Sequence, residues 1–189
     1  MKHLFTLIIL AITPLAFAQS IFEKYEDMDN VTSVVVNQKM FSMLAEMQIK
    51  TNDPEADAFL EQVKALNNLT VYTTDDDAIC KAIMADVKQY VKSTNMEELM
   101  RIKDGEQNVK FYVLSGRDEN HVSELLMLVN GLSEVTKKQN IKVGGQDRVV
   151  ETVLLSLMGD IDLRKVSELT NQLNVPGGEQ LKKASKGKK

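Results

Sequence analysis

The sequence predicts an α+β domain with a single five-stranded mixed sheet and helices packed mainly on one face. The chain has 189 residues, 43% hydrophobic and 26% charged, so one core can bury roughly two thirds of its unfolded surface. Five segments have the β-branched and apolar composition of strands: 31–36, 69–72, 109–114, 122–129 and 149–158. Long helical crossovers join the first two strands, as in parallel neighbours, and the last three lie close enough for an antiparallel meander.

The chain divides into three predicted parts: a cleavable signal peptide over 1–18, the domain over 19–175, and a flexible basic tail over 176–189. Lys2 and His3 precede an apolar run from Leu4 to Leu15, and Ala16-Phe17-Ala18 has the small-x-small pattern of a cleavage site. The run is short for a membrane span, which needs about 20 apolar residues. We therefore expect cleavage after Ala18 rather than a retained anchor or a buried core helix. Because the predicted leader is cleaved, a periplasmic or otherwise exported protein is expected. No Cys follows the run to accept a lipid, so we do not expect lipid attachment at the new N-terminus.

Methionines mark the first predicted helix of the domain, which Asn37 can cap. Apolar residues recur there at helical spacing, at Met40, Met43, Leu44 and Met47. We expect this methionine stripe to pack in the core, because Phe41 and Ala45 flank it and no His or Cys is interleaved. A soft-metal site or an adaptable binding groove is the alternative.

Aspartates begin the next two predicted helices. Asp53 and Pro54 suit the first positions of a helix that continues to Leu66. Three consecutive carboxylates head the following helix, namely Asp75, Asp76 and Asp77. They lack the alternate spacing around a glycine turn that a Ca²⁺ cage needs, so we expect helix capping rather than a cation site. Cys80 falls on the apolar face of this helix, and we expect a buried structural thiol rather than a reactive or metal-binding one.

Local patterns predict the connections in the second half of the domain. Thr94 and Glu97 have the spacing of a capping box, which predicts a short helix over 96–102. The polar connection over 131–148 contains strand-like residues at 141–143, which predict an extended hairpin rather than an unstructured loop.

Asp160 and Asp162 close the last predicted strand and precede a helix with Leu163, Val166, Leu169 and Leu173 inward. We expect one of the two carboxylates to cap that helix. They can point to opposite sides and need not share a substrate. A catalytic pair is the alternative, and it needs a second partner from elsewhere in the chain and one raised pKa.

Two strands are apolar at consecutive positions, over 125–129 and 153–158. A strand with one solvated face alternates instead, so both faces of the sheet centre are expected to be buried. Helices on one face, with the N-terminal segment or a crossover on the other, explain this pattern. A partner on an open face, either a second copy or an apolar ligand, is the alternative.

The sequence contains few groups suited to catalysis. His121 is the only His beyond the leader, so a histidine metal cluster cannot form and a catalytic triad must use this residue. We expect a solvent-facing or capping His, and we predict no catalytic, cofactor-binding or metal-binding residues and no cofactor. A non-catalytic binding or interaction protein of the cell envelope fits best, with self-association or an envelope partner through the sheet face. A carboxylate-based hydrolase using Asp160 or Asp162 is the alternative.

Charge is unevenly distributed along the chain. When Lys2 and the five lysines of the tail are left out, 17 of the 23 basic residues remain, against 27 acidic residues. Such an acidic body argues against nucleic-acid binding, which needs a basic face. The C-terminal lysines could make weak contact with anionic membranes, which gives a second alternative, a peripheral membrane protein attached through its tail.

Two segments, VSELLMLVNG (122–131) and VLLSLMGDIDLRKVSEL (153–169), resemble a family of small exported proteins of Bacteroidetes known as domain of unknown function 4252. The similar pattern of strand, Gly-Asp turn and helix lies behind a signal peptide and a helical first half. The resemblance implies an exported location and an uncharacterised role. It provides no functional residues to transfer.

Overall fold

The computed structural model describes residues 21–46, 60, 62–139, 142–143, 146–147 and 149–164. Its elements are η1 (Glu23–Tyr25), β1 (Thr32–Asn37), α1 (Gln38–Glu46), β2 (Leu66–Thr74), α3 (Asp77–Thr94), β3 (Glu97–Asp104), β4 (Gln107–Ser115), β5 (His121–Asn130), α4 (Ser133–Gln139), β6 (Lys142–Val143), β7 (Gln146–Asp147) and β8 (Thr152–Asp162). The predicted signal peptide, the basic tail, the beginning of the helix at Asp53 and most of the helix after Leu163 lie outside these residues.

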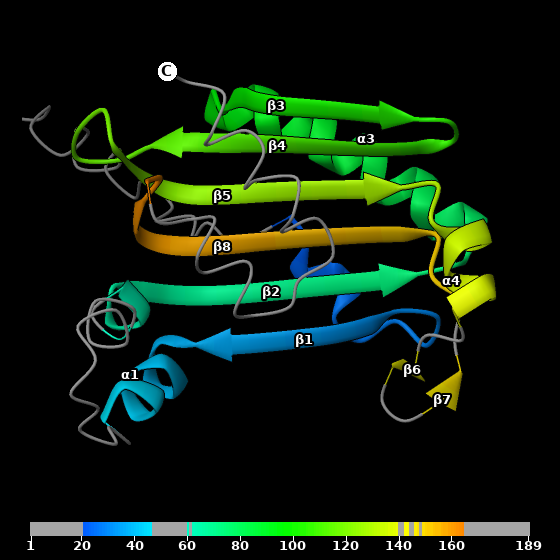
Figure 1. Cartoon of the computed structure of the whole chain (residues 1–189), viewed down its shortest axis with the longest axis horizontal. Helices are drawn as coiled ribbons and strands as arrows, with labels where there is room; N and C mark the ends of the chain where they lie inside the picture. Colours follow the sequence, from blue (N-terminus) through cyan, green and yellow to red (C-terminus); the bar gives the residue numbers. More distant parts are fainter. Residues whose placement is uncertain are drawn as a thin grey trace, which may run out of the picture.

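The fold is α+β, as predicted, with six strands in the order β1-β2-β8-β5-β4-β3 (Figure 1). All neighbouring strands are antiparallel, so the prediction of a five-stranded mixed sheet was wrong. The first two strands, β1 and β2, were expected to run parallel, but they run antiparallel. Helix α1 contacts both β1 and β2, and the chain re-enters the sheet at the end where it left it, which makes the two strands antiparallel.

The sixth strand is β3, where the sequence predicted a helix over 96–102. Helix α3 continues through Thr94 and ends at Asn95, which adopts a left-handed conformation with φ 56°. Thr94 therefore does not cap a new helix, and its hydroxyl donates to the carbonyl of Tyr90 instead. A two-residue turn that begins with Gly105, at φ 57°, then pairs β3 with β4.

The predicted meander of the last three strands is confirmed, because β5 pairs with β4 on one side and β8 on the other. The long connection between β5 and β8 begins with helix α4, which was not predicted. The hairpin expected there is confirmed for the short pair β6 and β7.

Both faces of the sheet centre are buried, as the apolar strands predicted. Residues 124–129 of β5 and 152–157 of β8 are buried without interruption. On one face, α3 lies behind β3, β4 and β5 (Figure 1) and packs with η1 against Tyr72, Leu126 and Leu154. The opposite face carries a second cluster that includes Phe111, Met127 and Leu155, together with Phe41 from α1.

Helix α1 buries the side opposite to the one predicted. Phe41 and Ala45 are 3% and 1% exposed, whereas Met40, Met43 and Leu44 are each nearly half exposed. The expectation that the methionine stripe packs in the core was therefore wrong for these three residues. The helix packs at the corner of the sheet beside β1 and β2, where one narrow face is enough to cover the strand ends.

Candidate functional site

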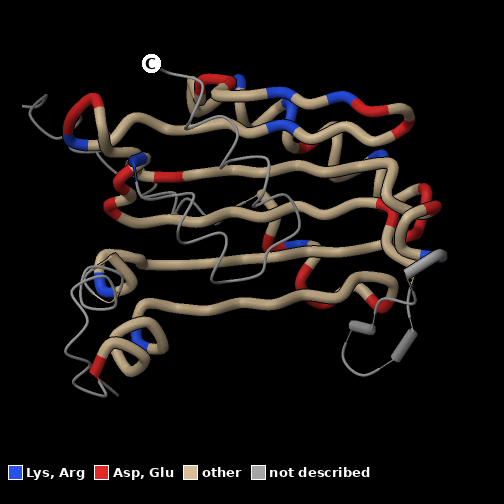
Figure 2. Tube along the Cα trace, in the orientation of Figure 1, with Lys and Arg blue, Asp and Glu red and all other residues tan. Residues whose placement is uncertain are grey.

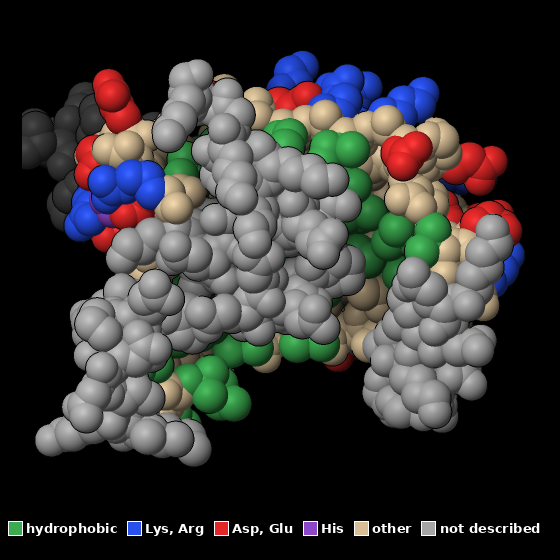
Figure 3. Space-filling model, in the orientation of Figure 1, with side chains coloured by type: hydrophobic (Ala, Val, Ile, Leu, Met, Phe, Trp, Pro, Cys, Tyr) green, Lys and Arg blue, Asp and Glu red, His purple; other side chains and the backbone are tan. Residues whose placement is uncertain are grey.

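An exposed apolar surface lies along one edge of the sheet. Five of the eight large hydrophobic side chains that are exposed in the described part of the chain belong to β1 or α1, namely Val34, Val35, Met40, Met43 and Leu44. We call these five residues the β1–α1 surface. Figure 3 shows hydrophobic side chains at the lower margin of the molecule, where Figure 1 places β1 and α1.

The two edges of the sheet differ in charge. Strand β1 has the sequence TSVVVN, without a charged residue, whereas β3 has the sequence EELMRIKD. Figure 2 shows charged residues along β3 and none along β1. Charged side chains on an edge strand discourage the addition of another strand. The outward backbone groups of β1 lack this protection.

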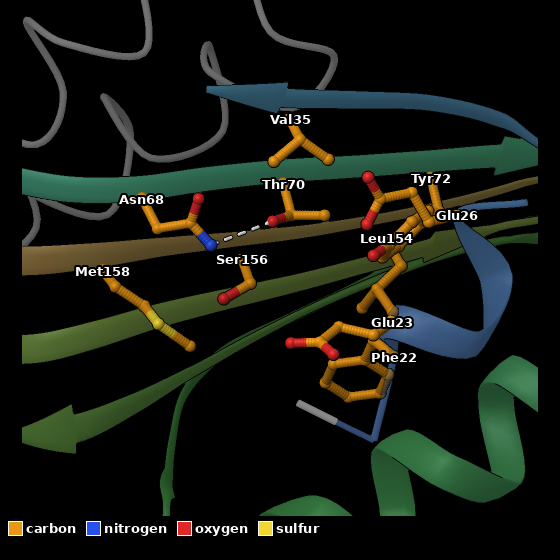
Figure 4. A pocket seen from close by; sticks show the side chains of 10 residues that line it. All are labelled: Phe22, Glu23, Glu26, Val35, Asn68, Thr70, Tyr72, Leu154, Ser156 and Met158. Atoms are coloured by element: carbon orange, nitrogen blue, oxygen red, sulfur yellow. Dashed lines mark hydrogen bonds between the residues drawn. The ribbon is translucent and has the colours of Figure 1, made fainter. Parts of the chain in front are cut away.

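A pocket opens on the α3 face beside β1 (Figure 4). Its volume is about 100 Å³, and its floor consists of polar side chains from two neighbouring strands, Asn68 and Thr70 of β2 and Ser156 of β8. The strand register explains this floor, because Thr70 lies opposite Ser156 and next to Val35 of β1. The rest of the lining is Phe22, Glu23, Glu26, Val35, Tyr72, Leu154 and Met158.

A buried carboxylate lies next to this floor, on the same face of the sheet. Glu124 of β5 is only 3% exposed, and its two oxygens each accept a hydrogen bond at 2.8 Å, Oε1 from the hydroxyl of Ser156 and Oε2 from that of Tyr90. Burial raises the pKa of Glu124, and the two hydrogen bonds oppose that rise. Sequence reasoning missed this residue, although one Glu within the apolar run VSELLMLV is itself a sign of a buried polar contact.

The residues that the sequence analysis considered for the alternative of catalysis, His121, Asp160 and Asp162, lie near the turn between β4 and β5. His121 Nδ1 lies 2.7 Å from Asp118 Oδ1, and its Nε2 lies 2.7 Å from the guanidinium of Arg117. Arg117 only donates, so Nε2 accepts and the Nδ1 proton goes to Asp118. Both ring nitrogens are therefore engaged, and neither contacts a hydroxyl that could serve as a nucleophile.

Asp160 and Asp162 lie at the end of β8, as the sequence predicted. The helix that one of them was expected to cap lies mostly outside the described residues, so its capping stays a prediction. Asp160 pairs with Arg117 at 3.0 Å, and Asp162 accepts from both the backbone N–H and the guanidinium of Arg164. The contact with Arg164 lowers the pKa of Asp162. Residues two apart share a face of a strand, and both carboxylates lie beside the same turn, but each has an arginine partner.

The capping role predicted for the three aspartates is confirmed for Asp76. Its Oδ1 accepts from the backbone N–H groups of Ala78 and Ile79 at 2.9 and 3.0 Å, and these bonds hold its pKa below the usual range. Asp75 precedes this cap and Asp77 begins the helix. Cys80 is buried as predicted, at 5% exposed. Among the described residues, no group of three or more His, Cys, Asp or Glu side chains is placed to hold a metal ion.

Comparison with known protein families assigns the chain. The profile of the domain of unknown function DUF4252 matches residues 25–169. The chain belongs to the DUF4252 family. No curated protein and no solved structure matches it.

The region matched to DUF4252 contains the whole six-stranded sheet and the β1–α1 surface. It also contains every residue of the pocket except Phe22 and Glu23. In the described part of this DUF4252 protein, the helices are too short or too polar to span a lipid bilayer.

Proposed function

We propose that this DUF4252 protein is an exported, non-catalytic interaction protein of the cell envelope that binds a protein partner through its β1–α1 surface. The observation that carries the proposal is the pairing of an uncharged edge strand with exposed apolar side chains. Val34 and Val35 are 50% and 46% exposed, and Met43 on the adjoining helix is 48% exposed.

Two physical properties make this surface suitable for a protein partner. An edge strand offers unpaired N–H and C=O groups to which another extended segment can add. Methionine side chains are flexible and polarizable, so the exposed side of α1 can adapt to an apolar partner. The exposure of Met40 and Met43 favours an adaptable binding groove over core packing.

Site-specific photo-crosslinking in the producing cell tests this proposal. A photoreactive amino acid replaces Val34 or Met43, and a control replaces Leu99, which is 43% exposed on the opposite edge strand. We expect a discrete protein adduct at the first two positions and not at Leu99. A Val34→Lys change should remove the adduct formed from position 43. Equal adducts at both edges, or a position-43 adduct that persists in the Val34→Lys variant, would contradict the proposal.

The proposal includes an exported location in a Bacteroidetes cell, with the leader cleaved after Ala18. Mass spectrometry of the mature product tests this part, and we expect an N-terminus at Gln19. A product that begins at Met1 would rule out cleavage. Weak contact of the lysines in 176–189 with anionic membranes also stays a prediction, tested by liposome co-sedimentation with and without residues 179–189.

A hydrolase receives less support from the geometry than an interaction protein. Asp160 and Asp162, the carboxylates considered for that chemistry, each pair with an arginine. The contact with Arg164 lowers the pKa of Asp162, whereas a general acid near neutral pH needs a raised pKa.

A further inference from the structure

The two ends of the edge strand β1 lie beside opposite charges. Strand β1 itself is uncharged. Asp27 and Asp29 lie shortly before it, and Lys39 lies in the first turn of α1, which follows it directly. All three side chains are exposed. Figure 2 shows Asp or Glu beside the beginning of β1 and Lys or Arg near its end. A second copy of this segment, running antiparallel, would therefore bring each acidic end to a basic end.

Exposed apolar side chains also lie beyond both ends of β1. Met28, before the strand, is 37% exposed, and Met40, in the helix after it, is 46% exposed. Asp29 and Met28 lie five and six residues before Val34, and Lys39 and Met40 lie five and six residues after it. Antiparallel pairing centred on Val34 therefore directs each Asp29 toward a Lys39 and each Met28 toward a Met40. A twofold interface requires such a self-complementary surface, because every contact in it occurs twice.

The difference between the two edges of the sheet limits the size of such an assembly. Pairing through β1 joins two six-stranded sheets and leaves a β3 strand at each outer edge. The charged side chains of β3 discourage the addition of a further strand. Pairing through β1 therefore stops at two copies. At the centre of the interface, β-branched valines would lie opposite each other, and such cross-strand pairs stabilise a sheet.

We propose that the partner of the β1–α1 surface is a second copy of this chain. The two sheets join edge to edge through antiparallel β1 strands, about a twofold axis at Val34. Asp29 of each copy lies beside Lys39 of the other, and α1 of each copy covers Met28 of the other. The inference rests on the proposed function, since it names the protein that the surface binds.

Sedimentation velocity of the purified mature chain, over a range of micromolar concentrations, tests the inference. We expect an equilibrium between monomer and dimer. Val34→Lys should abolish the dimer, because two like charges would lie directly opposite each other at the twofold axis. Leu99→Lys makes a similar change on the opposite edge strand, where Leu99 is 43% exposed, and should leave the dimer unchanged.

Charge reversal tests the orientation of the two strands. Lys39→Asp or Asp29→Lys should each weaken dimerisation about tenfold, because two exposed ion pairs per dimer become two like-charge contacts. An equimolar mixture of these two variants should restore the affinity of the parent, since both contacts again join opposite charges. Lys103→Asp on β3 is the matched control and should have no effect. Circular dichroism of each variant confirms the fold.

A chain that stays monomeric overturns the inference. If position 43 then crosslinks to a different protein, the proposed function still stands. A dimer that persists in Val34→Lys also overturns the inference, as does a mixture of Lys39→Asp and Asp29→Lys that pairs no better than either variant alone. Absence of both the dimer and any adduct from position 43 would overturn the inference and the proposed function together.

Discussion

Replacing Glu124 by Gln should stabilise the protein by an amount that grows as the pH rises. In the unfolded chain this carboxyl has its ordinary pKa of 4.5, whereas in the folded protein burial raises the pKa. Between these two values the folded state holds a proton that the unfolded state has released. The unfolded state therefore binds fewer protons, and stability falls as the pH rises through the folded pKa. Gln keeps the shape of the side chain and removes the titration.

The size of the effect follows from linkage. Each pKa unit of upward shift costs about 1.4 kcal/mol of stability once the pH lies above the folded pKa. Below the ordinary pKa of 4.5 both states are protonated, so the variant and the parent should differ little there. Gln can also serve the hydroxyls of Ser156 and Tyr90, accepting from one with its carbonyl oxygen and donating to the other with its amide.

Urea unfolding followed by circular dichroism, across the range from mildly acidic to mildly alkaline pH, measures the difference in unfolding free energy between Glu124→Gln and the parent. Glu119→Gln, an exposed Glu on the turn before β5, is the control and should give a constant difference. Glu124→Leu should be less stable than Glu124→Gln at every pH, because two hydroxyls lose their acceptor at a cost of about 1–3 kcal/mol each. A Glu124→Gln advantage that does not grow with pH would refute the reasoning.

Three further outcomes follow from the geometry. Gly131→Ala places a Cβ 2.2 Å from a backbone carbonyl oxygen, at φ 83°. It should lower the free energy of unfolding, measured in urea, by about 1–3 kcal/mol. Gly105→Ala, at φ 57° with open space around it, should lower it by only about 1 kcal/mol. Asp76→Ala should lower the urea midpoint more than Asp75→Ala, and the difference should disappear as acid protonates Asp76, because its stabilising bonds require the carboxylate. The thiol of Cys80 should react with a disulfide reagent only as fast as the protein unfolds, since the thiol is buried and burial raises its pKa.

The sequence predicted the centre of the sheet well and its edges poorly. The consecutive apolar residues of β5 and β8 predicted burial on both faces, and the structure confirms it. Strand β3 has no such signal. Its EELMRIKD sequence contains good helix formers, and only Met100 and Ile102 pack on the core. The turn at Gly105 and the pairing with β4 that it allows decide its conformation.

The candidate sites depend on contacts that sequence spacing cannot supply. The exposure of Met40 and Met43 is decided by which side of α1 meets the sheet corner, and both sides of that helix carry apolar residues. Glu23 and Ser156 lie 133 positions apart in the printed sequence and meet because η1 packs beside β8. Asp76 could be predicted as a cap because its contacts lie within three residues of it.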